Sequence, residues 1–470
     1  MKTTGLAPLW FGIVCLIVAS TGMAAVTLYS SDSLYAYSMA LDVIQFHTLS
    51  GWTYSAVPFF FPDVLLALPL AGLLRDPWYF HLASSPVLVL LFVAGVSRYL
   101  APAWRVRYAD AFVAAAAAVT GLVVAGLVLP APFEGIVTPA FVFVYHASVA
   151  FVAVALYLLT RADMFGVLRR HWILSLLAVV LLTLSDLYFA VYFGALILVS
   201  FEPRRWRPFL ALAIPYGVVV IAVLVLSLGI NDSLLEQATG SLAVAGEPYP
   251  ALRHGLVLLW VPGLAVAGLA WRRRLSSVSL RLYAGMVLAM LLIIAAGLIR
   301  DVYGFRYLVL VYAVSIVLYA ELLICAPVWS RNALLLAATL FLAGRGLAGA
   351  DDPGIDAYQA EIACIADSVP TGATIVAEYW PAKMVFETLH RRYNLLQVTE
   401  TLRPRGWISN RRWRRLHPDN GISLVVAARL EPDTWHRLQA LPDARALCGG
   451  LVLEVKQPAR ALVRQMQAQD

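Results

Sequence analysis

Charged residues are scarce in this chain. Only 13% of its 470 residues are Asp, Glu, Lys or Arg, whereas 61% are hydrophobic. Soluble domains average about 25% charged and about 45–50% apolar residues, so this composition excludes an ordinary soluble protein. Many hydrophobic runs also reach the length of about 17–25 residues that spans a bilayer. The sequence therefore predicts a polytopic α-helical membrane protein.

Several familiar chemical signatures are missing as well. The sequence has no H-E-x-x-H zinc motif, no G-x-S-x-G nucleophile elbow, no P-loop and no Rossmann glycine motif. The net charge of +7 does not indicate nucleic-acid binding, because the arginines lie in short loops between hydrophobic runs. Positive charge in such loops usually keeps them in the cytoplasm.

Cysteine is rare, with four residues and no C-x-x-C metal pattern. Cys15 and Cys325 lie in hydrophobic runs, where we expect small buried side chains. Cys364 and Cys448 lie in the more polar C-terminal part. If that part is extracytoplasmic, its oxidising compartment favours a disulfide between them.

The hydrophobic runs predict about 11–13 transmembrane helices. The candidate spans cover residues 9–29, 58–74, 79–100, 110–130, 139–160, 172–186, 187–201, 208–229, 255–271, 280–299, 307–325 and 331–349. The first run is too long for the core of a cleaved signal peptide, so we expect a retained helix whose N-terminus is cytoplasmic.

Basic segments indicate which loops face the cytoplasm. These segments are 161–171, 201–207, 271–274 and 326–332, and alternation from them places 231–254, 300–307 and everything after 350 outside. The first half is less regular. Two full spans between Phe59 and Leu100 would put Arg98, Arg105 and Arg107 outside, against the charge rule. Either one of these spans is interfacial, or the rule fails locally.

The composition changes after residue 350. Charge rises, and β-rich runs alternate with helical ones. The β-rich runs are 374–380, 394–400, 422–428 and 451–457, and the helical ones are 357–368, 382–390, 432–440 and 458–468. This alternation predicts a small α/β domain with a largely parallel sheet. We therefore expect a transmembrane domain at 1–350 and an extracytoplasmic α/β domain at 351–470.

The first outer loop, residues 30–63, contains three aspartates and no Lys or Arg. Ser30, Ser31 and Asp32 suit a helix N-cap, and the following residues have helical spacing of apolar side chains. A helix along the outer membrane surface would display Asp32 and Asp42. Pro58 and Pro62 would end this helix, and Asp63 would then lie at the outer boundary of the membrane. Carboxylates desolvated without a basic partner tend to have raised pKa values, which suits them to proton abstraction. Helix capping and a solvated helix face are the structural alternatives for these aspartates.

The run 172–201 is apolar, with basic loops on both sides, so it must enter and leave the membrane on the same face. Asp186 stands at its midpoint in the sequence TLSDLYF. We expect it at an outer turn between two short helices. It could cap the second helix or take part in a site.

Taken together, these features resemble the GT-C superfamily, the polytopic glycosyltransferases that use polyprenyl-phosphate sugars. The resemblance rests on SSDSLYAY just after the first helix and on FFFPD, where the chain is expected to return to the membrane. It rests also on TLSDLYF, between the two short helices expected on either side of Asp186. It also rests on GFRYLVLVYAV at the outer start of a late helix, and on the α/β tail. Each motif is short, and the set covers most of the chain.

The resemblance implies an inverting glycosyltransferase with an aspartate general base in the first outer loop. Asp32 matches that position best, and Asp42 and Asp63 are alternates. Asp32 and Asp42 do not form a tight D-x-D, so we expect metal-independent catalysis without a cofactor, although a divalent cation is not excluded.

The resemblance also implies substrate contacts. Arg306 and Arg300 would hold the donor phosphate; their alternative role is snorkelling to the membrane interface. Asp186 belongs to the same outer surface. His254 is a candidate acceptor or phosphate contact, and Tyr37 could stack on a sugar or anchor the loop at the interface. Glu378, Tyr379, Trp407 and Asn410 could form a lid or simply pack the tail.

The expected partners are a polyprenyl-phosphate sugar, membrane lipids and an acceptor that is a lipid, a glycan or a protein. The expected location is a bacterial inner membrane. A secondary transporter or flippase would also have about twelve spans and buried charges, but such proteins tend to contain internal repeats, which are not evident here. A non-catalytic assembly or sensor protein is the third possibility.

Overall fold

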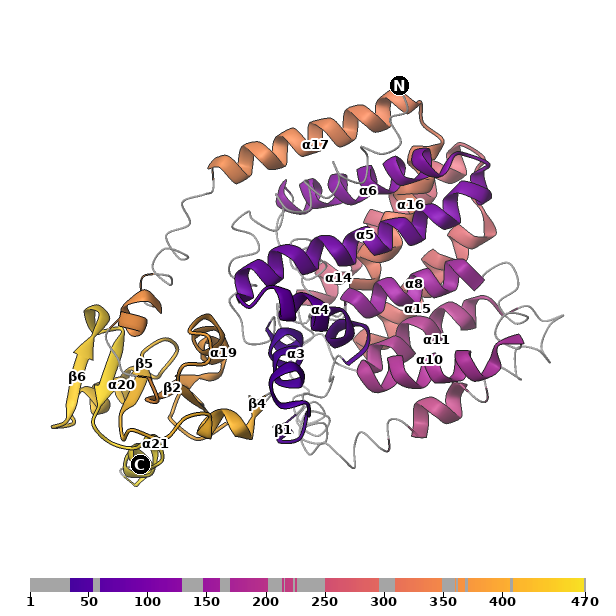
Figure 1. The fold of residues 1–470 in the computed structure, drawn as a ribbon. Coiled ribbons are helices and arrows are strands. Elements are labelled where there is room, and N and C mark those ends of the chain that lie inside the picture. The colour runs from indigo at the N-terminus through magenta and orange to yellow at the C-terminus, as the bar shows by residue number, and fades with distance from the viewer. Residues whose placement is uncertain are drawn as a thin grey trace. The chain divides into compact units, whose positions relative to one another are not determined.

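The computed structural model describes residues 34–53, 60–128, 147–160, 170–201, 214, 216–222, 225, 250–295, 309–348, 360, 362–367, 371–405 and 409–468 (Figure 1). The chain divides into two compact units, one mostly helical and one that contains a β-sheet. The helical unit comprises Met1–Ala24, Ala56–Asp63 and Leu82–Ala348, and the second unit comprises Ala25–Ser55, Val64–His81 and Gly349–Asp470.

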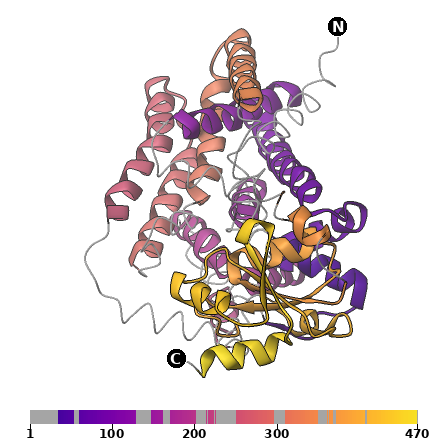
Figure 2. The ribbon, with the colours of Figure 1, turned by 90° about the vertical axis from the view of Figure 1, so that its left-hand side faces the viewer.

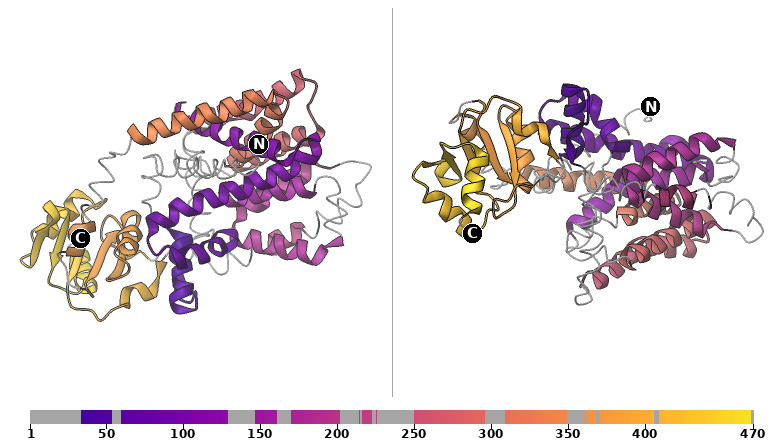
Figure 3. Two further views of the ribbon diagram at one scale, coloured as in Figure 1. Left: turned by 45° about the horizontal axis from the view of Figure 1, so that its top comes forward. Right: turned by 90° about the horizontal axis from the view of Figure 1, so that it is seen from below.

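Long apolar helices make up the described part of the helical unit. They are α5 (Pro77–Trp104), α6 (Tyr108–Val128), α8 (Ala147–Thr160), α10 (Trp172–Ser185), α11 (Leu187–Val199), α14 (Pro250–Trp271), α15 (Ser277–Ala295), α16 (Val309–Ile324) and α17 (Val328–Ala348). Helix α6 packs against α16 and α17, α11 packs against α15, and α14 packs against α16 (Figure 3). Helix α10 ends where α11 begins, with Asp186 between them, so the split helix pair expected from the sequence is present.

Small residues allow these helices to approach closely. A Cβ atom added to Gly285 of α15 would lie 2.7 Å from Cδ2 and 3.2 Å from Cα of Leu196 on α11. Small interface residues are typical of membrane helix packing. A buried polar contact also joins three helices, because Glu321 of α16 accepts hydrogen bonds from Tyr99 of α5 at 2.8 Å and Ser279 of α15 at 2.5 Å.

Three helices in the described part of the chain are long and apolar enough to cross a membrane. They cover Pro86–Trp104, Tyr108–Gly126 and Ser277–Ala295. Several others are apolar but shorter than eighteen residues, among them Ile173–Ser185 and Leu187–Val199. The candidate span 9–29 lies outside the described residues, as does most of 208–229.

The second unit contains the C-terminal α/β domain (Figure 2). Its strands are β2 (Thr374–Glu378), β3 (Asn394–Val398), β5 (Ser423–Val426), β6 (Ala444–Leu447) and β7 (Val452–Val455), in the order β3-β2-β5-β7-β6. The helices are α19 (Tyr379–Thr388), α20 (Pro432–Gln439) and α21 (Ala459–Gln467). Val376, Val425 and Leu453 of the sheet form one apolar core with Leu462 and Met466 of α21.

The sheet is mixed rather than largely parallel. Strand β2 runs parallel to β3 and β5, but β7 runs antiparallel to both β5 and β6. The reason is the short connection η6 (Cys448–Gly450) between β6 and β7, in which Gly449 and Gly450 have φ values of 66° and 90°. A tight turn of this kind can only join antiparallel strands, because a parallel crossover needs a dozen or more residues.

Cys364 and Cys448 form a disulfide, the pairing that the sequence favours. It connects the helical residues 362–367 with the turn between β6 and β7.

The second unit also contains most of the described first loop, although the sequence predicts that this loop belongs to the transmembrane domain. Helix α3 (Tyr35–Phe46) packs against α4 (Leu65–Leu73), and β1 (Trp52–Thr53) pairs antiparallel with β4 (Ser409–Asn410) of the C-terminal part. The expected helix after Asp32 is therefore present as α3, and it belongs to the same unit as the C-terminal domain. The expectation that this helix displays Asp42, or leaves it on a solvated face, is wrong, because Asp42 is fully buried. The expected span 58–74 is interrupted, since Phe61 has extended backbone angles before α4 begins.

Candidate functional site

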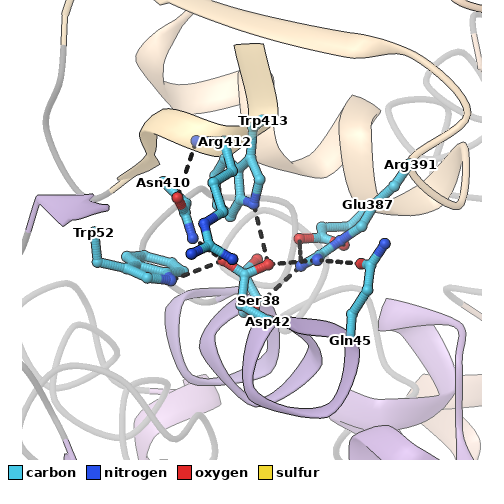
Figure 4. Close-up of polar contacts among 9 residues, drawn as sticks. All are labelled: Ser38, Asp42, Gln45, Trp52, Glu387, Arg391, Asn410, Arg412 and Trp413. Carbon is cyan, nitrogen blue, oxygen red and sulfur yellow. Dashed lines mark hydrogen bonds and ion pairs between the residues drawn. The ribbon is translucent and has the colours of Figure 1, made fainter. Parts of the chain in front are cut away.

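Asp42 is the centre of a buried polar cluster in the second unit (Figure 4). Its Oδ2 accepts hydrogen bonds from Trp52 Nε1 at 2.7 Å and Asn410 Nδ2 at 2.6 Å. Its Oδ1 accepts from Arg391 Nη1 at 2.5 Å and Trp413 Nε1 at 3.1 Å. The carboxylate is fully buried and receives four donors, so both oxygens are occupied.

Local backbone structure brings these donors to Asp42. Gly51 has φ +90°, which an L side chain rarely adopts, and this turn leads Trp52 into the strand pair with Asn410. Asn410 has two roles: its Oδ1 accepts from Arg412 N at 3.0 Å and so begins the 3-10 helix η5 (Arg411–Arg415), while its amide nitrogen reaches Asp42. Trp413 is the buried residue of η5.

Arg391 supplies the positive charge of the cluster. Its Nε and Nη2 bind the Glu387 carboxylate in a bidentate pair, both at 2.8 Å. The same guanidinium also donates to the Ser38 carbonyl at 3.1 Å and to Gln45 at 3.1 Å. It lies 5.6 Å from the ring of Trp413, a cation–π distance. Arginine suits this position because its planar fork can bind two carboxylates at once.

Two charged side chains of the cluster have shifted pKa values. Burial raises the pKa of Asp42, and the Arg391 charge and the hydrogen bonds from Asn410 and Trp413 oppose that rise. Burial alone would lower the pKa of Arg391, but Glu387 and Asp42 outweigh it, so the pKa is raised. We conclude that Asp42 holds α3 to the C-terminal domain. A general base needs a carboxylate oxygen that can accept a proton from the substrate. Both oxygens of Asp42 already accept hydrogen bonds, so the prediction of Asp42 as an alternate base is not supported.

A second acidic cluster lies in the helical unit. Asp63 and Asp186 are both fully buried, and they lie close enough for their charges to interact. Oδ2 of Asp63 accepts from Ser148 Oγ at 2.8 Å, whereas its Oδ1 has no hydrogen-bond partner among the described residues. The Phe61 amide donates to Ser185 Oγ at 2.7 Å, which ties the FFFPD segment to the turn of the split helix pair.

Asp186 acts as the N-cap of α11, since its Oδ1 accepts from Tyr188 N at 2.8 Å. The capping interpretation is therefore correct, and it occupies one oxygen of the carboxylate. Since Asp186 also lies within electrostatic range of Asp63, capping and a role in a site are compatible.

The remaining predicted site residues have different placements. Tyr37 is fully buried, and its hydroxyl donates to the Arg75 carbonyl at 2.6 Å, so its ring is a packing element and is not open to a sugar. His254 lies in α14. Asp32, Arg300 and Arg306 lie outside the described residues, as does Trp407. Asn410 packs against Asp42, as described above.

The sequence reasoning missed Arg391, Trp413 and Ser148. One signal could have revealed the first two. Residues 390–417 contain eight arginines and a single acidic residue, Glu400, whereas the first outer loop contains three aspartates and no Lys or Arg. The two segments have opposite charge, and in the structure Arg391 and Trp413 of the basic segment donate hydrogen bonds to Asp42 of the loop. Ser148 has no comparable signal in the sequence.

Among the described residues, no group of three or more His, Cys, Asp or Glu side chains comes together as a metal site. No family model matches the chain, and neither a curated protein nor a solved structure matches it.

Proposed function

We propose that this protein is a membrane glycosyltransferase of the GT-C type. It would move a sugar from a polyprenyl-phosphate donor to an acceptor hydroxyl at the outer face of a bacterial inner membrane. The observation that carries the proposal is the meeting of two of the motifs on which the resemblance rests. The FFFPD and TLSDLYF segments, more than 120 residues apart in the chain, are joined by the Phe61–Ser185 hydrogen bond.

In this mechanism an aspartate of the first loop takes the proton of the acceptor hydroxyl. The acceptor oxygen then forms a bond to the anomeric carbon from the face opposite the lipid phosphate. The bond between that carbon and the phosphate oxygen breaks, and the lipid phosphate leaves with inversion at the sugar. Asp32 is the first candidate for the base. Asp63 is the alternate, since its Oδ1 has no hydrogen-bond partner among the described residues.

Positive charge must stabilise the leaving phosphate, and Arg306 is the proposed ligand, with Arg300 and His254 as further contacts. No step requires a metal ion or cofactor. Treatment with a chelator is therefore expected to leave transfer unchanged.

The test is mass spectrometry of lipid-linked sugars in a deletion strain. Loss of the transferase should make one polyprenyl-phosphate sugar accumulate and should remove one sugar from a cell-envelope product. Complementation with the intact gene should reverse both changes. An unchanged pool of lipid-linked sugars, measured together with an unchanged envelope, would contradict the proposal.

A second candidate is a proton-coupled transporter. The buried Asp63 carboxylate, one oxygen of which has no partner in the described part of the chain, also suits a proton carrier in a membrane domain. Purified protein in detergent distinguishes the two. A glycosyltransferase forms a product in solution from donor and acceptor, whereas a transporter needs two compartments.

A further inference from the structure

Helix η5, with the sequence RRWRR, brings four arginines into a single short turn. Because a 3-10 helix has about three residues per turn, Arg411 and Arg414 point to the same side of it. Arg412 points to a different side, where its Nη2 donates to Ser50 Oγ of the first loop at 2.8 Å. Arg412 is therefore engaged with the first loop, whereas Arg411 and Arg414 share a separate face of η5.

Arg460, near the start of α21, belongs with these two side chains. Arg414 is half-buried, and the charges of Arg460 and Arg411 both act on it. Burial lowers the pKa of Arg414, and these two neighbouring positive charges lower it further. Both η5 and α21 belong to the second unit, so the grouping is a property of that unit alone. We call Arg411, Arg414 and Arg460 the arginine cluster.

The arginine cluster lacks a balancing negative charge among the described residues. No carboxylate within this part of the chain forms an ion pair with any of its three members. Arg391 is different, because Asp42 and Glu387 both bind its guanidinium. Like charges that lie together without a counter-charge repel one another. The arginine cluster therefore costs the domain stability unless an anion binds to it.

Arg460 also lies at the unfavourable end of its helix. It is the second of the nine residues of α21, where the helix dipole is positive and the first amide groups lack partners within the helix. Cations are favoured at the opposite end. The first turn of α21 has no acidic residue, and no side chain of the described residues caps it. A bound anion would relieve both the repulsion between the arginines and the positive charge at this helix start.

Phosphate is the anion that this cluster fits best. A guanidinium binds oxyanions through paired N–H donors. A phosphate group offers three acceptor oxygens and carries about 1.5 to 2 negative charges near pH 7, whereas a carboxylate offers only two oxygens and a single charge. Three positively charged side chains from two elements therefore match a phosphate group better than a carboxylate.

We propose that Arg411, Arg414 and Arg460 form a phosphate-binding site on the C-terminal domain. The ligand carries its phosphate either in an anionic lipid headgroup or in a soluble phosphorylated compound. The proposal uses neither Arg306 nor the sugar chemistry, so it succeeds or fails independently of the proposed function.

Arginine footprinting of the purified full-length protein tests the site. Phenylglyoxal modifies guanidinium groups, and peptide mapping by mass spectrometry reads each arginine separately. Inorganic phosphate is the probe, and sodium chloride of equal ionic strength is the reference. Phosphate should protect the three arginines of the cluster and leave the exposed Arg415 unprotected. Equal modification of the cluster in phosphate and in chloride would overturn the proposal.

Matched substitutions then measure the contribution of the central arginine. Arg414→Gln should weaken phosphate binding roughly 10- to 150-fold, the range for one charge-assisted contact. Arg415→Gln is the control, because it removes the same charge from the next position of η5 but from a different side of the helix. Affinity is read from the phosphate concentration that half-protects Arg460, and Arg415→Gln should match the wild type. Equal losses in both variants would show only a general effect of charge and would overturn the site. If Arg414→Gln does not fold, the footprint of the wild type still decides.

Lipid nanodiscs distinguish the two sources of phosphate. A headgroup ligand protects the cluster in phosphatidylglycerol nanodiscs without added phosphate, but not in phosphatidylcholine, whose choline neutralises the phosphate. A soluble ligand gives no protection in either lipid until inorganic phosphate is added. Both results support the site and identify its ligand. Unprotected cluster arginines in both lipids, with and without phosphate, would overturn it.

Discussion

Arg391 and Asp42, 349 residues apart in the chain, form a buried ion pair with 2.5 Å between Nη1 and Oδ1. Removing one partner of a buried pair leaves an uncompensated charge and typically costs about 3–5 kcal/mol. Asp42→Ala would also leave Trp52, Asn410 and Trp413 without their acceptor. We therefore expect it to release α3 from the C-terminal domain, seen as rapid proteolysis near residue 50.

The matched control is Asp110→Asn in the surface pair Arg107–Asp110, where the arginine side chain is 78% exposed. Exposed pairs contribute little to stability. The melting temperature of Asp110→Asn should therefore equal that of the wild type. Equal stability of Asp42→Ala and Asp110→Asn would show that the buried cluster does not hold α3.

Gly51→Ala tests the turn that delivers Trp52. An added Cβ would lie 2.9 Å from Asn410 Oδ1, at a φ of +90°. Gly421→Ala is the control, because Gly421 also has positive φ (+75°) but no atom within 4 Å of the new Cβ. Backbone strain of about 1–2 kcal/mol should affect both variants. Thermal unfolding should show a larger loss for Gly51→Ala, and an equal loss would argue against close packing between Gly51 and Asn410.

The disulfide between Cys364 and Cys448 should contribute strongly to the stability of the tail. Removing a native disulfide typically costs about 2–5 kcal/mol. Cys364→Ser, Cys448→Ser and the double variant should therefore unfold at the same, lower temperature. Peptide mapping of the wild type without reductant should recover the linked peptides. Two thiols that react freely in the native protein would contradict the pairing.

Arg306→Ala should weaken binding of the lipid donor. A charge-assisted contact to phosphate is worth about 1.5–3 kcal/mol, or roughly 10- to 150-fold in affinity. Arg306→Lys should recover only part of this, because an ammonium lacks the planar fork of arginine. The measurement is donor affinity with the folded state checked in parallel. Unchanged affinity in Arg306→Ala would make the residue a membrane anchor.

Much of the fold follows from sequence periodicity. The expected strands near 374, 394, 422 and 451 appear as β2, β3, β5 and β7, and the split at Asp186 lies where the polar residue interrupts the apolar run. Strand β6 was missed because its residues, ARAL, are half exposed and lack β-branched side chains. Its pairing with β7 through a glycine turn made the sheet mixed.

The cluster around Asp42 could not be deduced in the same way. Helical spacing shows that Asp42 follows Ser38 by one turn, but not which face of α3 is buried. The buried face depends on Arg391, Asn410 and Trp413, which come from a segment more than 340 residues later. Long-range pairing of this kind has no local pattern, and only the opposite charge of the two segments indicates it.

Transfer activity of aspartate variants tests the central claim most directly. Asp32→Asn and Asp63→Asn retain side-chain size and hydrogen bonding but cannot accept a proton. With purified protein, defined donor and acceptor, one of them should lose about 10²–10⁴-fold in turnover while donor binding and melting temperature stay near wild type. We expect Asp32→Asn to be the variant that loses turnover. Full turnover by both variants, each correctly folded, would contradict a first-loop aspartate base and with it the glycosyltransferase mechanism.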